Sequence, residues 1–433
     1  MSETWIKILE TVDKEKEKIV DLVSQLIRIP STNPPGDTSE VAGYISDYLN
    51  NLGIKTQNYE SKPGLVSIVA KVGRDRGKKI LLNGHVDVVP VGDAASWMVE
   101  PFSGKVYEGQ IWGRGASDMK GGVAAILSTL SILQNHDVLD GLQGAIECSI
   151  VPDEETDGYL GTGWLIDKGI IKEGDLAIIA EGTISPLFGY GICVMEKGGL
   201  TLKLKSKGAE AHGGMPFLGD NAIEKLMRIL PKIKILENKD LKLPHQVIKL
   251  IEKTKPLYQE VGKLIGFPEE KIEPFLKQLL VNITRIAGGV ADNVIPAEAS
   301  AIMDVRIPPG ITIGEVYNLF SELIVREGKG DFILEQLSYW DPSMEKGEDS
   351  PAAKLVEKAI LKVDSSAKIY HVYSSGGSDA KFFRAIGIPT VLFGPGQPEL
   401  AHSANERIII QDLVKAVKIY LTGILDYLAP EDR

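Results

Sequence analysis

From residue 79 the chain reads Lys79-Ile80-Leu81-Leu82-Asn83-Gly84-His85-Val86-Asp87, an apolar run that ends at a histidine and an aspartate. A short apolar run of this kind is typical of a buried strand. Three more strands are expected at residues 66–72, 145–151 and 176–180. Helices with apolar positions three and four apart lie among these runs, for example at residues 121–133. The alternation predicts an α/β fold with a layered, mixed sheet.

The pattern changes at about residue 192, where the expected elements follow the order β-α-β-β-α-β of a ferredoxin-like α+β domain. The α/β pattern resumes after about residue 342. We therefore expect residues 1–191 and 342–433 to form one discontinuous domain, interrupted by a second domain at residues 192–341. A Lys/Glu-rich segment near residues 238–277 is expected to add helices to the inserted domain.

Length and composition exclude several classes of protein. A chain of 433 residues is too long for one ordinary core, so two or more domains are expected. The net charge of −11 argues against a nucleic-acid partner, because there is no basic surplus to neutralise phosphates, and it disfavours an anionic membrane surface. Two cysteines, Cys148 and Cys193, imply no disulfide framework. Without a run of about 18 apolar residues or an apolar signal-like N-terminus, a cytoplasmic protein is expected.

Histidine and carboxylate side chains follow the expected strands or lie in glycine-rich segments. A site for two divalent cations needs such ligands from several loops, with one carboxylate to bridge the cations and one unligated base. Asp118 is one candidate ligand, since the glycines of residues 113–122 allow the backbone to come close to a metal centre. The other candidates are His85, Asp87, Glu154, Glu155, Glu181 and His402.

Each of these groups also has an ordinary explanation when it is taken alone. His85 and Asp87 point to one face of a strand, where Asp87 could orient a metal-binding imidazole or simply form a His–Asp hydrogen bond. Asp118 could be a helix N-cap. The adjacent Glu154 and Glu155 could form a solvated acidic turn instead of a metal ligand beside a free base.

Two further loops carry weaker signals. His212 is flanked by glycines in Ala211-His212-Gly213-Gly214, so taken alone it is expected to be an exposed bystander. The loop Gly376-Gly377-Ser378-Asp379 could form a phosphate-type nest, but no P-loop lysine pattern accompanies it. Neither cysteine has a candidate His–Asn partner, and no Gly-x-Ser-x-Gly motif occurs, so cysteine and serine nucleophiles are not expected.

Taken together and in this order, the motifs are far more specific than their members. The set resembles the metallopeptidase and amidohydrolase family of acetylornithine deacetylase, succinyl-diaminopimelate desuccinylase, aminoacylase and glutamate carboxypeptidase. The resemblance runs from residues 29–36 to His402, and its most specific segments surround Asp118 and the pair Glu154-Glu155. It implies a catalytic α/β domain with an inserted lid that often dimerises, and thus a homodimer formed through residues 192–341.

The resemblance implies which residues bind each ion of a two-zinc centre. Asp118 bridges two Zn²⁺ ions, for which Co²⁺ or Mn²⁺ could substitute, and its peptide bond to the next residue is expected to be cis. His85 and Glu181 complete one zinc site. Glu155 and His402 complete the other.

The resemblance also implies catalytic and substrate-binding roles. Glu154 is the general base, Asp87 orients the first zinc-bound imidazole, and His212 polarises the scissile carbonyl, usually in the partner's active site. The positions that match substrate contacts are Asn293, Arg306, Gly376, Gly377 and Ser378.

The implied reaction is hydrolysis of the amide bond of N-acyl amino acids or small peptides by metal-activated water. Arg306 would select a substrate with a free carboxylate beside the scissile amide. An aminopeptidase or dipeptidase with the same metals is one alternative, and it would need a carboxylate for the substrate's amine. A non-catalytic metal-binding homologue is another, although every candidate ligand is present. The long segment 238–277 leaves open whether His212 serves its own site or the partner's.

Overall fold

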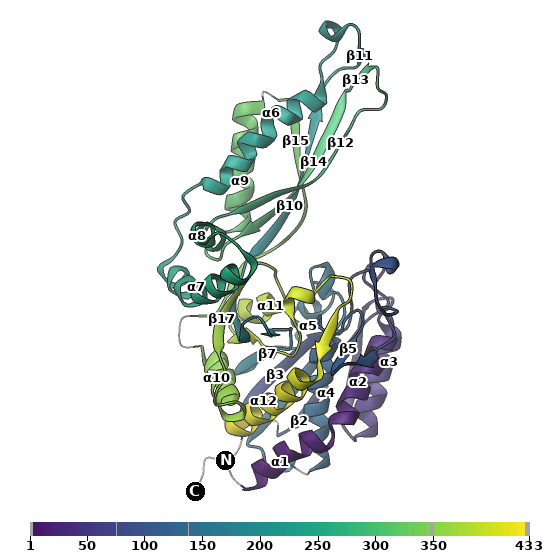
Figure 1. Cartoon of the computed structure of the whole chain (residues 1–433), viewed down its shortest axis with the longest axis vertical. Coiled ribbons are helices and arrows are strands. Elements are labelled where there is room, and N and C mark those ends of the chain that lie inside the picture. The colour runs from purple at the N-terminus through teal and green to yellow at the C-terminus, as the bar shows by residue number, and fades with distance from the viewer. Residues whose placement is uncertain (1–2, 75, 137, 329, 347–349, 429–433) are drawn as a thin grey trace. The chain divides into compact units, whose positions relative to one another are not determined.

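The computed structural model describes residues 3–74, 76–136, 138–328, 330–346 and 350–428 and divides into two compact units (Figure 1). The first unit comprises Met1–Val194, Glu345–Val372 and Ser378–Arg433, and the second comprises Met195–Met344 and Tyr373–Gly377. The chain crosses at 194/195 and 344/345, against the predicted 191/192 and 341/342. The prediction was wrong for residues 373–377, which belong to the second unit, where the N–H of Lys197 donates to the carbonyl of Ser374.

A mixed sheet forms the centre of the first unit, in the strand order β1-β2-β6-β3-β7-β18-β9. Strands β6, β3, β7 and β18 run parallel, whereas β1, β2 and β9 pair with their neighbours in antiparallel fashion. The predicted α/β fold with a mixed sheet is therefore confirmed. The strands are β1 (Thr56–Lys62), β2 (Leu65–Gly73), β3 (Lys78–His85), β6 (Gly144–Val151), β7 (Leu176–Ile179), β9 (Gly189–Glu196) and β18 (Thr390–Leu392), with β8 (Ile184–Ser185) and β17 (Ile369–Ser374) also paired to β9.

Helices cover both faces of this sheet, because successive side chains of a strand point to opposite faces. Helix α4 (Lys120–Asn135) packs so closely against β3 that a Cβ atom at Gly84 would lie 3.0 Å from Val123. Leu81 points to the opposite face and joins a buried cluster with α5 (Thr162–Asp167) and α11 (Ala380–Ala385). The other helices of this unit are α1 (Glu3–Lys14), α2 (Lys16–Arg28), α3 (Ser39–Asn51), α10 (Pro351–Val363) and α12 (Ile410–Leu428).

A small three-stranded sheet joins the segment before Asp118 to the segment after His402. It consists of β4 (Lys105–Tyr107), β5 (Gln110–Trp112) and β19 (Arg407–Ile409), with β5 in the centre. The sequence did not predict these strands, which have only three residues each. None of the helices in the described ranges has both the length and the apolar character that a membrane-spanning segment needs.

An antiparallel four-stranded sheet, in the order β12-β14-β10-β15, forms the second unit. Helices α6 and α9 cover one face of it (Figure 1). Leu200, Leu202 and Leu204 belong to the buried core between the sheet and these helices. The elements follow the chain in the predicted ferredoxin-like order: β10 (Gly198–Lys207), α6 (Ala222–Lys234), β12 (Leu280–Gly288), β14 (Glu298–Ile307), α9 (Ile313–Gly328) and β15 (Phe332–Trp340).

The segment at residues 238–277 contains two helices, α7 (His245–Ile265) and α8 (Ile272–Lys277), between α6 and β12. These helices contact each other and are joined by an ion pair between Lys255 and Glu273 at 3.6 Å. Three short strands complete the second unit: β11 (Ala211–His212) paired with β13 (Val294–Ile295), and β16 (Ser343–Met344) paired with the end of β9.

Candidate metal centre

The candidate metal ligands gather at one edge of the first unit's sheet. Because β6, β3, β7 and β18 are adjacent and parallel, their carboxyl ends share an edge, which is where open α/β sheets bind ligands. His85 is the last residue of β3. Glu154 and Glu155 begin the 3-10 helix that follows β6, Glu181 follows β7, and His402 lies in the segment after β18.

Asp118 lies between two imidazoles. Its Oδ1 is 3.2 Å from Nε2 of His85, and its Oδ2 is 3.2 Å from Nε2 of His402. The peptide bond from Asp118 to Met119 is cis, as expected. A carboxylate with one oxygen toward each imidazole has the arrangement needed to bridge two cations.

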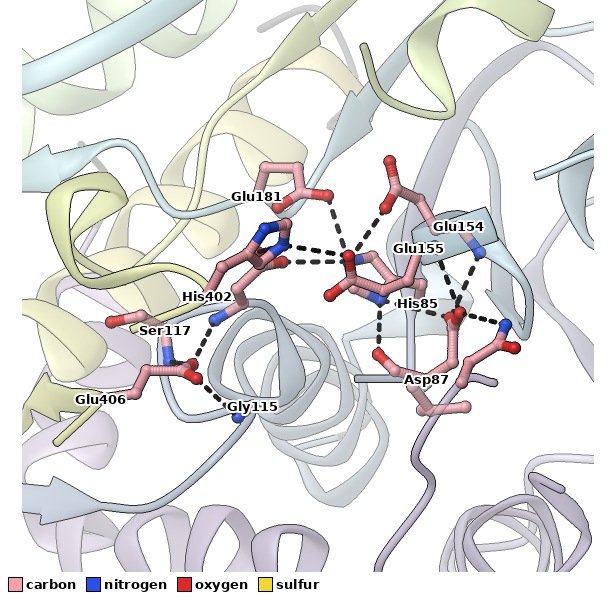
Figure 2. Close-up of polar contacts among 12 residues, drawn as sticks. His85, Asp87, Gly115, Ser117, Glu154, Glu155, Glu181, His402 and Glu406 are labelled. Carbon is pink, nitrogen blue, oxygen red and sulfur yellow. Dashed lines mark hydrogen bonds and ion pairs between the residues drawn. The ribbon is translucent and has the colours of Figure 1, made fainter. Parts of the chain in front are cut away.

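Three glutamates surround this centre (Figure 2). Glu181 Oε1 is 3.3 Å from Nε2 of His85, and Glu154 Oε2 is 3.7 Å from the same nitrogen. Glu155 Oε2 is 3.0 Å from Nε2 of His402. Two sets of side chains bring ligand atoms within 4.8 Å of one another: His85 with Glu154 and Glu181, and His85 with Asp118 and Glu155.

The electrostatics of the site suit cations. Burial raises the pKa of Glu154 well above its usual value, an effect that His85 opposes and that Glu181 and Glu155 reinforce. Burial also raises the pKa of Glu155 and of Glu181, and the charge of Asp118 adds to both shifts. Crowded, buried carboxylates of this kind are costly unless cations or protons compensate for them.

The same carboxylates raise the pKa of both imidazoles. Burial alone would lower the pKa of His85, but hydrogen bonds to Asp118, Asp87 and Glu181 raise it well above the usual value. Hydrogen bonds to Asp118 and Glu155 raise the pKa of His402 to about 10. Glu155 Oε1 is buried and has no hydrogen-bond partner within the described ranges. An orphaned oxygen on a carboxylate whose other oxygen contacts His402 fits a cation ligand.

Asp87 organises the centre in a way that differs in detail from the prediction. Nδ1 of His85 contacts the main-chain carbonyl of Asp87 at 2.9 Å, whereas the carboxylate Oδ1 is farther away, at 3.4 Å. The carboxylate instead accepts hydrogen bonds from Asn33 Nδ2 at 2.9 Å and from the main-chain N–H groups of Glu154 and Glu155 at 3.2 Å each (Figure 2). Asp87 thus orients His85 and also holds the glutamate pair.

The sequence did not reveal Glu406, a fully buried carboxylate that holds the Asp118 loop. Glu406 Oε1 accepts the N–H groups of Ser117 at 2.8 Å and Asp118 at 3.0 Å. Its Oε2 accepts the N–H of Gly115 at 3.0 Å (Figure 2). The same oxygen accepts Nη1 of Arg114 at 2.7 Å. Burial and the charge of Asp118 raise the pKa of Glu406 to about 7, although Arg114 opposes the shift.

Arg114 also forms hydrogen bonds with two other loops. Its guanidinium donates to the carbonyl of Ser403, next to His402, at 3.2 Å. It also donates at 3.3 Å to the carbonyl of Pro90, in the segment that follows β3, and it lies 5.1 Å from the ring centroid of Trp97. One buried ion pair therefore connects loops that carry ligands of both proposed cations.

Asp379 is a second buried carboxylate, which the sequence singled out only as part of a possible phosphate-type nest. It follows Ser378, which is also buried, and it accepts a hydrogen bond from Thr162 Oγ1 at 2.8 Å. Its Oδ1 has no hydrogen-bond partner in the described part of the chain. Burial raises the pKa of Asp379 to about 6, and the charge of Asp379 helps to raise the pKa of Glu154.

The predicted substrate-binding residues of the second unit form two groups that lie near opposite ends of its sheet. His212 and Asn293 are neighbours, since the N–H of Gly213 donates to the carbonyl of Asn293 at 2.7 Å. They lie beyond the end of the sheet at which Lys207 of β10 pairs with Glu298 of β14. Arg306 is near the other end of β14, where its Nη1 donates to the carbonyl of Ser375 at 3.3 Å, beside Gly376 and Gly377. The strand between the two groups spans roughly 25 Å.

Comparison with known proteins gives consistent matches over most of the chain. The model of peptidase family M20/M25/M40 matches residues 81–426. A probable succinyl-diaminopimelate desuccinylase of Staphylococcus aureus is 30% identical in an alignment of 429 positions, gaps included, that covers 96% of this chain and 99% of the relative. An N-formyl-4-amino-5-aminomethyl-2-methylpyrimidine deformylase of Halalkalibacterium halodurans is 29% identical in an alignment of 444 positions, gaps included, that covers 97% of each protein. A solved M20 metallo-carboxypeptidase of Sulfolobus solfataricus has a TM-score of 0.80 at 22% identity and covers 94% of this chain and 99% of its own.

Proposed function

The chain belongs to peptidase family M20/M25/M40 and is a metal-dependent hydrolase of amide bonds, and from this premise we propose that it uses two divalent cations to hydrolyse N-acyl amino acids or small peptides. Zn²⁺ is the expected cation, with Co²⁺ or Mn²⁺ as substitutes. The observation that carries the proposal is the position of Asp118, whose two oxygens each lie 3.2 Å from a different imidazole.

The donor set suits two cations that share one carboxylate. His85, Glu181 and one oxygen of Asp118 would hold the first cation, and Glu155, His402 and the other oxygen of Asp118 would hold the second. When bound, such a pair would polarise a carbonyl group and lower the pKa of a coordinated water from its value in bulk to about 7. Every ligand is present, which argues against a non-catalytic homologue.

Glu154 is the proposed general base. Its carboxylate lies 3.7 Å from Nε2 of His85, farther than the carboxylate of Glu181 at 3.3 Å, which leaves it free to take a proton from the attacking water. Burial raises the pKa of Glu154 well above its usual value. A carboxylate with a raised pKa can hold this proton and return it to the leaving amine.

His212 is proposed to stabilise the oxyanion that forms on the scissile carbonyl. Its Nδ1 accepts the N–H of Gly214 at 3.0 Å, which assigns the ring proton to Nε2, where it can be donated to substrate. A well-placed donor of this kind contributes roughly 3–4 kcal/mol to transition-state stabilisation. Asn293 lies beside His212 and would contact the same substrate.

We assign His212 and Asn293 to the active site of a partner subunit, in a homodimer formed through the inserted domain. Within one second unit they are roughly 25 Å along the sheet from Arg306, so the two groups cannot contact one small substrate together. Strand β12 is an edge of this sheet, and its residues 282–288 are exposed, so it offers an unpaired edge to a second copy.

Arg306 is the proposed contact for a substrate carboxylate. Its Nε donates to Asp304 Oδ2 at 3.0 Å and its Nη1 to the carbonyl of Ser375 at 3.3 Å, which orients the guanidinium. The planar guanidinium can then bind a carboxylate through two parallel hydrogen bonds. The main chain of Gly376 and Gly377, together with Ser378, would contact the rest of the substrate.

An aminopeptidase or dipeptidase activity is a second candidate because of Asp379. Such an enzyme needs a carboxylate for the free amine of its substrate, and Asp379 Oδ1 is buried without a hydrogen-bond partner among the described residues. Asp379 is also close enough to Glu154 for its charge to raise the pKa of that residue.

The test is a substrate panel on protein reconstituted with Zn²⁺ or Co²⁺. We expect release of amino acid from N-acetyl, N-formyl or N-succinyl substrates, complete loss of turnover on chelation, and two cations per chain by metal analysis. Preferred cleavage of dipeptides with a free amine would favour the second candidate instead. Undiminished activity of protein that holds only trace metal would overturn the two-cation proposal.

A further inference from the structure

The inserted helices α7 and α8 have no part in the proposed reaction, yet they hold Lys197, at the start of the second unit. Lys197 is 1% exposed, and its ammonium donates to the carbonyls of Phe275 at 2.6 Å and Gln278 at 3.0 Å, at the end of α8. The same ammonium lies 5.4 Å from the ring centroid of Phe275 and 5.7 Å from that of Tyr373. Burial and the charge of Arg306 lower the pKa of Lys197 to about 7. Its amino group can donate these hydrogen bonds with or without the charge, so they tie the insertion to the unit.

A second contact joins the insertion to the segment Tyr373–Gly377. The hydroxyl of Tyr258, on α7, donates to the main-chain carbonyl of Tyr373. The ring of Tyr258 packs 5.4 Å from the ring of Phe275, centroid to centroid, so the hydroxyl and ammonium contacts belong to one aromatic cluster. The insertion therefore holds the first residue of a segment that also contains Gly376 and Gly377.

Lys197 is connected to Arg306 through Trp340. The indole N–H of Trp340 donates to the main-chain carbonyl of Lys197 at 3.1 Å, and the guanidinium of Arg306 lies over the indole, 4.8 Å from its centroid. The indole has little freedom to move, because a Cβ atom would lie 2.2 Å from the ring at Gly199 and 2.4 Å from it at Gly377. The ring thus forms a fixed platform for the guanidinium.

The segment Tyr373–Gly377 contacts both Lys197 and Arg306. The N–H of Lys197 donates to the carbonyl of Ser374 at 2.9 Å, and Nη1 of Arg306 donates to the carbonyl of Ser375 at 3.3 Å. Two series of contacts therefore connect the insertion with Arg306. One passes through Trp340, and the other passes through the main chain of this segment.

We propose that the α7–α8 insertion is a specificity element that fixes Arg306 and the segment Tyr373–Gly377 in the arrangement that receives a substrate carboxylate, with Lys197 and Tyr258 as positioning residues. This inference rests on the proposed function, since it takes Arg306 to be the carboxylate contact. A guanidinium that is already held in place loses less conformational freedom when a carboxylate binds, so the insertion should act on substrate binding and not on bond cleavage.

The experiment compares two substrates on the metal-loaded full chain: the best N-acyl amino acid of the panel, and the same compound with its carboxylate converted to a carboxamide. Tyr258→Phe removes one anchor and Lys197→Met removes the other. For each variant we expect KM for the carboxylate substrate to rise roughly 3- to 10-fold with kcat unchanged, the loss of about one hydrogen bond. The kcat/KM for the carboxamide should stay at the wild-type value.

A matched control lies on the same insertion. Glu273→Gln removes ion pairs with Lys255 at 3.6 Å and Lys277 at 2.6 Å without contacting the Lys197 cluster, so both substrates should keep their wild-type constants. Thermal unfolding verifies that each variant is folded, and Tyr258→Phe, which keeps the aromatic ring, remains informative if Lys197→Met does not fold.

Failure of the inference can be distinguished from failure of the proposed function by Arg306→Ala. If wild type and Arg306→Ala both treat the two substrates alike, Arg306 does not bind the carboxylate, and the proposed function and the inference fall together. If Arg306→Ala abolishes the preference but folded Tyr258→Phe and Lys197→Met retain it, the inference alone is overturned. An equal loss on both substrates also overturns it, because the insertion would then not determine specificity.

Discussion

The two units arrange their functional residues in opposite ways. In the first unit, His85 is 1% exposed, and its Nε2 lies within 3.7 Å of three carboxylates from separate loops. In the second unit, His212 is exposed at one end of the sheet and Arg306 lies near the other. Parallel neighbours bring successive loops to one edge, whereas antiparallel neighbours alternate between two ends.

The two units therefore differ in what they contribute to the proposed reaction. The first unit by itself completes a candidate metal centre, and its buried carboxylates hold one another's loops in place. The second unit offers substrate contacts in two groups, one of which must serve a different active site if both are used. The following variants test whether the first unit binds the cations and the second unit contacts the substrate, from the largest expected effect to the smallest.

The largest effect is expected for Glu154→Gln. Turnover should fall roughly 10²- to 10⁴-fold, because the attacking water loses its base. Metal content should not change, since His85 keeps its closer contact to Glu181 at 3.3 Å. Metal analysis and kcat measure the two properties, with Glu155→Gln, which should lose metal, as the comparison. Retention of most of the kcat would show that Glu154 is not the base.

His212→Ala should lower kcat roughly 10²- to 10³-fold through loss of an oxyanion donor, and it should leave the metal content intact. If His212 acts in the partner's site, mixing this variant with Glu154→Gln subunits should restore part of the activity, because mixed dimers contain one site with both groups. Activity that stays absent after proven subunit exchange would assign His212 to its own chain's site or to none.

Glu406→Gln should weaken cation binding roughly 10- to 100-fold, because an amide group cannot accept hydrogen bonds at both of its ends. Chelator competition measures the affinity. The matched control is Glu345→Gln, another carboxylate that is only 2% exposed, which lies 3.8 Å from Arg384 and accepts the N–H of Thr390. Both variants should lower the unfolding temperature, but only Glu406→Gln should change cation affinity. Equal affinity in the two variants would contradict a role for Glu406 in the metal centre.

The smallest effect concerns Cys148, which lies in β6 among buried neighbours. Burial, aided by the charge of Glu147, raises the pKa of the Cys148 thiol to about 12. At pH 8 roughly one thiol in 10⁴ is then ionised, so a thiol reagent should leave Cys148 unmodified in the native protein and modify it after unfolding. Rapid native modification would mean that the sheet opens far more readily than its packing indicates.

Much of the fold was predictable because the deciding patterns are local. The apolar runs at residues 66–72, 79–83, 145–151 and 176–180 correspond to β2, β3, β6 and β7, since burial of a strand or helix leaves a periodic record in its own residues. Short elements such as β4, β5 and β19 leave too few residues for a period to be recognised.

The sequence by itself determined the α/β class, the ferredoxin-like insertion and a set of acidic and histidine candidates. Only the tertiary structure decided how they meet. The Arg114–Glu406 ion pair joins residues 292 positions apart, residues 373–377 belong to the second unit, and His212 is separated from Arg306 by the length of a strand. Periodicity reports whether a side chain is buried. It does not report which distant segment covers that side chain, because strand order and loop contacts depend on packing among residues far apart in the chain.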